Sequence, residues 1–104
     1  MTVTLDGATL LHTTFSNVNG VADHRQAYPD AYPNGDHAAG TGAAAINSLG
    51  YTQGSAHHNK DSTYRLVFEV DHATASLMLR IAAQNLSPFP DEYWGIDNVK
   101  VSVK

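Results

Sequence analysis

The sequence predicts an all-β fold, an antiparallel β-sandwich that spans residues 1–104 as a single module. Three observations predict it. Apolar and polar residues alternate in short runs, turn-forming residues separate these runs, and no stretch shows the periodicity of a useful amphipathic helix. A chain of 104 residues is long enough for one two-layer core and too short for two domains.

The first predicted element is a β-hairpin over residues 3–11. Asp6-Gly7 lies between two apolar runs, and this dipeptide tolerates the positive φ angles of a tight hairpin turn. We expect the second strand to continue through Phe15 and to end at residues 16–20, which are rich in turn formers.

Residues 21–42 are predicted to form a long irregular loop. Tyr28-Pro29 and Tyr32-Pro33 interrupt any regular element, because proline lacks a backbone donor and restricts the residue before it. Loops of this length are uncommon in small domains and are often functional. Tyr28 and Tyr32 therefore have two interpretations: they pin the loop to the core, or they present flat faces to a ligand.

Three further strands are predicted in the C-terminal part. Residues 64–70 and 77–83 alternate in polarity and are close in sequence, so we expect them to pair as a hairpin. Residues 97–103 are expected to close the fold, with three valines on one face. Asp97 shares that face in a regular strand, and its burial is costly unless a cation or several donors meet it.

Composition and charge disfavour several partners. The formal net charge is −4 and the six Lys and Arg residues are scattered, so we expect neither nucleic acid nor an anionic membrane surface as a partner. No apolar run reaches the length of a membrane span. The chain has no cysteine, which excludes disulfides and thiolate metal sites. Charged residues make up only 15%, while small polar residues are abundant, which favours extracellular β-structure.

The N-terminus carries no signal peptide pattern, because Met1 is followed at once by a strand pattern. We therefore expect the chain to begin inside a longer natural polypeptide, or Met1 to be an introduced start. The expected location is extracellular or at the cell surface.

Acidic and amide side chains gather just before the predicted closing strand. Calcium binds six to eight oxygen atoms from carboxylates, carboxamides and carbonyls on flexible loops. Asp91, Glu92, Asp97 and Asn98 supply such oxygens within a few residues, so we predict a structural Ca²⁺ site here. The alternative, equally open from spacing alone, is that Asp97 caps backbone amides while Asp91 and Glu92 are solvated.

Trp94 is the only tryptophan, and it is either a platform on which a sugar stacks or a plug of the core. With Tyr28 and Tyr32 it forms the predicted set of ligand-binding side chains. We do not expect an enzyme. The six histidines lack the spacing of a catalytic zinc site, and no Gly-x-Ser-x-Gly elbow occurs. Asp91 and Glu92 lie in one short segment, where two carboxylates cannot easily flank a substrate.

Residues 91–99, Asp-Glu-Tyr-Trp-Gly-Ile-Asp-Asn-Val, resemble the motif Asp-Glu-Ser-Trp-Gly-(Ile/Leu)-Asp-Asn-Val that closes jelly-roll modules in bacterial secreted and surface proteins. Those modules are similar in fold to galactose-binding-like and concanavalin-like sandwiches. The resemblance implies that the acid of the final strand, Asp97 here, holds a structural calcium ion. Weaker similarity covers most of the remaining chain, at residues 3–15, 28–29, 40–44, 49–51 and 61–64.

The chain departs from this pattern in two places. Position 93 is Tyr instead of Ser, and modules of this kind have further strands before the hairpin at which this chain begins. The resemblance therefore implies a sandwich that is incomplete on its N-terminal side. An incomplete sandwich exposes strand edges, which invite strand addition by a neighbour.

These observations lead to two functional hypotheses. The first is a non-catalytic extracellular β-sandwich module with a structural calcium site, which binds carbohydrate or mediates adhesion. The second is a structural subunit that self-assembles, or pairs with a complementing chain, through its open strand edges.

Overall fold

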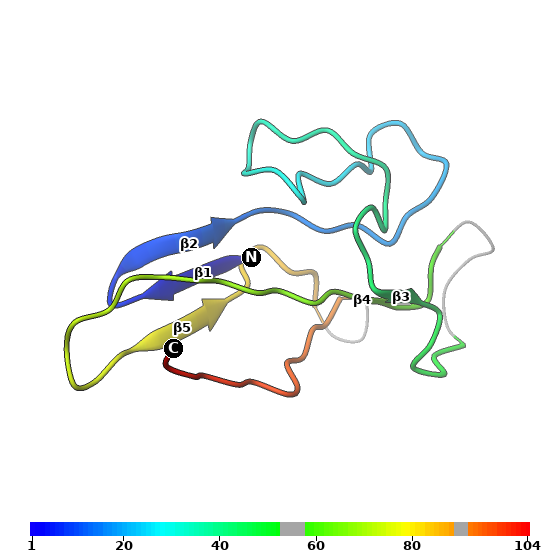
Figure 1. Cartoon of the computed structure of the whole chain (residues 1–104). Helices are drawn as coiled ribbons and strands as arrows, with labels where there is room; N and C mark the ends of the chain where they lie inside the picture. Colours follow the sequence, from blue (N-terminus) through cyan, green and yellow to red (C-terminus); the bar gives the residue numbers. More distant parts are fainter. Residues whose placement is uncertain (53–57, 89–91) are drawn as a thin grey trace.

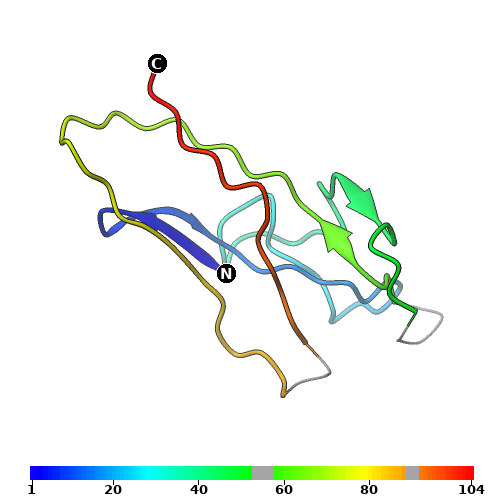
Figure 2. The same ribbon diagram turned by 90° about the horizontal axis from the view of Figure 1, so that it is seen from below.

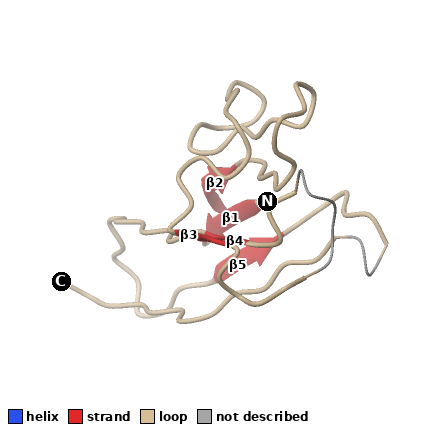
Figure 3. Ribbon diagram, turned by 90° about the vertical axis from the view of Figure 1, so that its right-hand side faces the viewer, coloured by secondary structure: helices blue, strands red, loops and turns tan. Residues whose placement is uncertain are grey.

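The computed structural model of the protein describes residues 1–52, 58–88 and 92–104 (Figure 1). The described residues contain five β-strands and no helix, so the predicted all-β class is confirmed. The strands are short, and most of the described chain is loop or irregular extended backbone (Figure 3). They are β1 (Thr2–Leu5), β2 (Ala8–His12), β3 (Ala45–Ile46), β4 (Ser62–Thr63) and β5 (Leu79–Ala82).

The N-terminal hairpin forms as predicted. β1 and β2 pair antiparallel, and Asp6 and Gly7 turn the chain with φ angles of 48° and 83°. These left-handed values are the reason that an Asp-Gly dipeptide suits the turn. The register shifts between Val3 and Thr4, which leaves Leu10 as an extra residue on the β2 side.

β5 completes a three-stranded antiparallel sheet with the order β2-β1-β5. Val3 lies opposite Leu11 on one side and Ile81 on the other, so the three side chains share one face. Val3 is the most buried apolar residue, with 1% of its surface exposed. A second, two-stranded sheet pairs β3 with β4.

The predicted hairpin between residues 64–70 and 77–83 is wrong. β5 pairs with β1, whereas residues 64–70 are assigned to no strand. Residues 64–75 instead cross in front of the sheet and form a second layer with the C-terminal segment (Figure 2). A nonlocal partner, β1, therefore displaces the sequence neighbour that the alternation pattern suggested.

The predicted closing strand over residues 97–103 is also not formed. Asn98 has a φ of 55°, in the left-handed region, which interrupts the extended backbone at that position. Residues 92–104 form no strand, and Val99, Val101 and Val103 are exposed. Because Asn98 breaks the alternation, Asp97 does not share a buried valine face, and that premise of the calcium prediction is wrong.

The core lies where the sheet meets the loop region, residues 13–48. Among the described residues the buried side chains are two small or branched apolar ones and three polar ones: Val3, Ala27, Thr13, Gln26 and Asp61. Large apolar side chains are exposed along most of the C-terminal half. The described residues thus form a three-stranded and a two-stranded antiparallel sheet beside extended segments that do not pair, and a complete sandwich is not formed.

Gln26 is the centre of the loop region. It is buried, with only 1% of its surface exposed, and all its side-chain hydrogen bonds are made within the chain. Its Oε1 accepts hydrogen bonds from Gly40 N (3.0 Å), Ser16 N (3.3 Å) and the Tyr64 hydroxyl (3.0 Å). Its Nε2 donates to the carbonyl oxygens of Tyr28 and Thr41, each at 2.9 Å. One buried amide side chain therefore joins five separate points of the loops and of residues 64–70.

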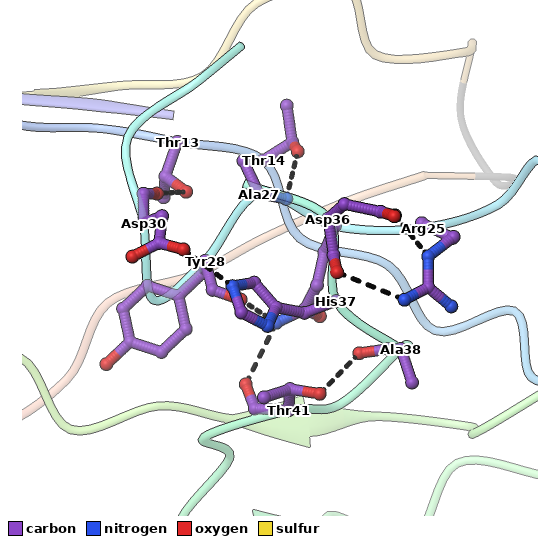
Figure 4. Close-up of polar contacts among 11 residues, drawn as sticks. Thr13, Thr14, Arg25, Ala27, Tyr28, Asp30, Asp36, His37, Ala38 and Thr41 are labelled. Carbon is purple, nitrogen blue, oxygen red and sulfur yellow. Dashed lines mark hydrogen bonds and ion pairs between the residues drawn. The ribbon is translucent and has the colours of Figure 1, made fainter. Parts of the chain in front are cut away.

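Further polar contacts fix the same loops (Figure 4). The Thr13 hydroxyl donates to Asp30 O at 2.8 Å, and the Thr14 hydroxyl accepts from Ala27 N at 2.9 Å. His37 Nε2 lies 2.8 Å from an Asp30 carboxylate oxygen, and Arg25 forms an ion pair with Asp36. No described buried side-chain polar atom lacks a partner, so the loop region is a satisfied polar structure.

Candidate functional site

The candidate site is an open layer, which we define as residues 64–75 and 92–104. These two segments lie on the same side of the three-stranded sheet, in a separate layer (Figure 2). Several large apolar side chains of this layer are exposed, among them Val67 at 70% and Val103 at 98%. The exposed set is Val67, Phe68, Val70, Tyr93, Trp94, Ile96, Val99, Val101 and Val103.

Exposure on this scale distinguishes the open layer from an ordinary surface. Single exposed apolar residues are normal, whereas a contiguous run of them marks an interaction site or an aggregation risk. Leu77, Met78 and Leu79 continue the exposed run into β5. The apolar surface therefore extends from the open layer to the free edge of the sheet.

The backbone of the open layer is extended but not paired. Among the described residues, no backbone-to-backbone hydrogen bond involves residues 65–75 or 94–104. Unpaired N–H and C=O groups along an extended segment are a template for another strand. The layer thus offers both parts of a strand-addition site, a row of backbone groups and alternating apolar side chains.

Asp6, at the β1–β2 turn, fastens the open layer to the sheet. Its Oδ1 accepts a hydrogen bond from Met78 N at 2.7 Å, and its backbone N donates to Met78 O at 2.9 Å. His72 Nε2 lies 2.8 Å from Asp6 Oδ2. The bond from Met78, and then the contact with His72, lower the pKa of the Asp6 carboxyl below its ordinary value.

Lys104 and Glu69 join the two segments of the open layer to each other by an ion pair. Both side chains are largely exposed, so solvent screens this pair and it adds little stability. Residues 64–75 are therefore held mainly near their two ends, by the His72–Asp6 contact at one end and by the Tyr64–Gln26 hydrogen bond at the other.

The predicted calcium ligands do not gather at one point. Asp97 is exposed and accepts hydrogen bonds from Asn98 N (2.7 Å) and Asn98 Nδ2 (3.2 Å). Glu92 accepts from Ser87 N at 2.6 Å, and Asp91 lies outside the described residues. In the part of the chain that the structure describes, no group of three or more His, Asp or Glu side chains could hold a metal ion.

Asp97 thus lies in the arrangement that the capping alternative describes, with its carboxylate on a backbone amide. The residues as placed do not form a calcium shell, so we derive no role through a bound ion. The calcium site remains a prediction that rests on the resemblance of residues 91–99.

The predicted ligand-binding aromatics have different surroundings. Tyr28 is half-buried against Phe15 and Tyr64, with ring centroids 5.0 and 5.2 Å apart, which fits the interpretation that it pins the loop. Tyr32 is exposed and contacts His12 edge to face at 5.6 Å. Trp94 is exposed at 39% of its surface, which fits a platform better than a core plug.

Sequence reasoning missed one aromatic pair and three polar residues with structural roles. Tyr51 and Tyr93 contact each other edge to face at 5.4 Å, although they are far apart in the chain. Asp61 is buried and accepts from Ser48 N and Leu49 N, while Asp6 and Gln26 make the contacts given above. The sequence identified Asp6 only as a turn residue, and nothing in it distinguished Gln26 and Asp61, because their partners come from distant segments.

No family model, curated protein or solved structure matches this chain. The resemblance of residues 91–99 therefore rests on those residues alone and shows no family. The described residues also contain no helix long and apolar enough to cross a membrane.

Proposed function

We propose that this chain is a non-catalytic structural module that works by strand addition, in which β-strands of another polypeptide complete its open layer. The observation that carries the proposal is the unpaired, extended backbone of residues 65–75 and 94–104 together with its exposed apolar side chains. An extracellular or cell-surface location is part of the proposal, because the chain is poor in charged residues and rich in small polar ones.

In the single chain the apolar side chains of the open layer stay in contact with water. Each apolar side chain removed from water contributes about 25 cal/mol per Å² of buried apolar surface. An added strand also satisfies the row of backbone groups, which gives affinity, while the alternating side chains set the register. The loop region offers less to an added strand, because none of its described buried side-chain polar atoms lacks a partner.

The first test measures assembly and protection together. We expect the molecular mass in sedimentation to rise with protein concentration between about 1 μM and about 1 mM, a range that corresponds to weak to moderate affinity. Amide hydrogen exchange in residues 65–75 and 94–104 should slow over the same range. Residues 2–12 serve as the internal control, because their strands are paired within the chain and their exchange should not depend on concentration.

Proline variants test whether the open-layer backbone is responsible. Val67→Pro and Val101→Pro each remove a backbone donor that has no internal backbone partner, so the monomer should still fold. Assembly should weaken in both if the two segments both accept strands. A chain that stays monomeric at every concentration, with fast exchange in both segments, contradicts self-assembly through the open layer.

A second candidate function is carbohydrate binding, and one observation favours it. Trp94 is exposed and follows Tyr93 of the Tyr51–Tyr93 pair in the sequence, and exposed aromatic faces are the surfaces on which sugar rings stack. A glycan array on the wild type and on Trp94→Ala tests this function, with Phe68→Ala as the matched control at another exposed aromatic. Binding that is lost in Trp94→Ala only supports it, and an array without signal rejects it.

A further inference from the structure

We propose that the strand added to the open layer is residues 64–70 of a second copy of this chain, paired antiparallel about a two-fold axis at Val67. The inference rests on the proposed function and names its partner. Residues 64–70 continue directly from β4, which pairs with β3. Beyond Thr63 this extended backbone has no hydrogen-bonded strand beside it among the described residues.

The register follows from the alternation of the side chains. In an antiparallel pair, residues directly opposite each other share a face, so only even shifts keep the apolar residues together. The register centred on Val67 keeps the alternation over all seven residues. It places opposite each other Tyr64 and Val70, Leu66 and Phe68, and Arg65 and Glu69, with Val67 facing its own copy.

Charge selects this register over its neighbours. Centred on Val67, Arg65 of each copy lies opposite Glu69 of the other, and such opposite-charge pairs stabilise a sheet. A register centred on Phe68 places Glu69 opposite Val67, and one centred on Leu66 places Arg65 opposite Val67. The register centred on Phe68 also brings Arg65 opposite Asp71, but it leaves Glu69 without a charged partner. Only the register centred on Val67 pairs both Arg65 and Glu69 with opposite charges, and two-fold symmetry forms this pair twice.

The required side chains are available in the single chain. Val67 is 70% exposed, and Arg65 is exposed as well. Glu69 forms an ion pair with Lys104 of its own chain, but both side chains are largely exposed, so this pair is weak and can exchange for Arg65 of the second copy. Tyr64 is half-buried, so the pairing is tightest over residues 65–69.

A charge-exchange experiment tests the pairing. Arg65→Glu and Glu69→Arg each place like charges opposite each other twice, so each should raise the dissociation constant of the dimer about tenfold or more. The double variant restores opposite charges and should return to within about threefold of the wild type. Lys104→Ala is the matched control, because it removes the intrachain partner of Glu69 and should leave the dimer intact or tighten it.

A cysteine experiment tests the two-fold axis. The chain has no native cysteine, so a single introduced cysteine reports one position. The Cα atoms of the two residues at position 67 should lie about 4.5–5.5 Å apart, within the range of a disulfide. Val67→Cys should therefore form a disulfide-linked dimer under mild oxidation. Phe68→Cys should not, because the copies of position 68 are diagonal neighbours about 7–8 Å apart.

The outcomes separate this inference from the proposed function. Restoration by the double variant, together with cross-linking at position 67, supports the inference. Assembly that Val101→Pro abolishes, but that charge exchange and Val67→Pro leave unchanged, overturns the inference and retains strand addition. Faster cross-linking through Phe68→Cys overturns the register. A protein that remains monomeric throughout overturns the inference and the self-assembly on which it rests.

Discussion

The loop region and the open layer differ in which of their groups find partners. In the loop region, polar groups are buried and bonded, with Gln26 alone joining Ser16, Gly40 and Tyr64. In the open layer, apolar side chains are exposed and the backbone has no strand beside it in the described chain. The first region is complete within the chain, whereas the second has the features of an unfinished sheet.

This difference indicates that the loop region determines the stability of the fold and that the open layer determines association. A satisfied buried polar network fixes one geometry, because each lost bond leaves a group without solvent or partner. An exposed apolar edge contributes little to the stability of the single chain. It contributes free energy only when another surface covers it and removes its apolar side chains from water. Substitutions in the loop region should therefore act on folding, and substitutions in the open layer should act on association.

The largest effect on folding is expected for Gln26→Met. Methionine has a similar length but removes all five hydrogen bonds, which leaves several buried donors and acceptors without partners. We expect the free energy of unfolding to fall by about 3–5 kcal/mol, since each buried unsatisfied group costs about 1–3 kcal/mol. Thermal and denaturant unfolding measure this loss.

Gln84→Met is the matched control, because Gln84 is exposed and makes no such network. Its effect should stay within about 0.5 kcal/mol. Equal effects of the two substitutions would contradict the assignment of Gln26 as the centre of the loop region.

A smaller effect is expected for Gly35→Ala. A Cβ atom at Gly35 would lie 2.0 Å from Ala27 O and 2.6 Å from Ala27 C, both of which are backbone atoms that cannot rotate away. The loops must shift to accommodate it, and such overpacking costs about 1–3 kcal/mol. Gly95→Ala is the control in the open layer, where a Cβ meets nothing within 4 Å. A Gly35→Ala variant as stable as the wild type would show that this close approach does not form.

How much the sequence predicted depended on how local the determining contacts are. The Asp6-Gly7 hairpin was predictable, because its turn and both strands lie within a few residues. The partner of β5 was not, since the alternation of residues 77–83 says nothing about whether β1 or residues 64–70 lies beside it. The interruption at Asn98 was also missed, although Asn is among the residues that tolerate a left-handed φ.

The candidate site was predicted only in part. The exposed strand edges followed from the incomplete sandwich that the resemblance implied, and the open layer has that character. Its position on residues 64–75 did not follow, because those residues were expected to pair within the chain. Gln26 and Asp61 gave no signal, since a polar residue in a loop becomes structural only through partners far away in sequence.

Asp6 connects the two regions, and its charge makes that connection depend on pH. Since its pKa is lowered in the folded chain, the stabilisation is present above the ordinary carboxyl pKa and is lost as pH falls through the lowered value. Asp6→Asn keeps a residue that tolerates the turn and removes the charge. We expect faster amide exchange over residues 71–78 in this variant at neutral pH, with the difference from wild type shrinking as pH falls through the lowered pKa of Asp6.

Asp30→Asn is a suitable comparison for that experiment, because Asp30 also contacts a histidine, His37, but lies in the loop region. Its effect should appear near residues 30–37 and leave residues 71–78 unchanged. A variant of Asp6 that exchanges like the wild type over residues 71–78 at neutral pH would show that the carboxylate does not fasten the open layer.

The smallest effect concerns the proposed calcium site at Asp97, because this carboxylate is exposed and in the open layer. We assume that calcium binds with the millimolar affinity of extracellular modules. A calcium concentration of about one to ten times the dissociation constant then stabilises the fold by only about 0.5–1.5 kcal/mol. We expect chelation and Asp97→Ala to lower the melting temperature by similar small amounts, and the two effects not to add, since both remove one interaction. Asp71→Ala is the control for loss of an exposed carboxylate, and its melting should remain sensitive to chelator. If chelator leaves the melting temperature of the wild type unchanged, Asp97 binds no calcium and only caps the backbone N–H of Asn98. The open layer would then gain stability from strand partners alone.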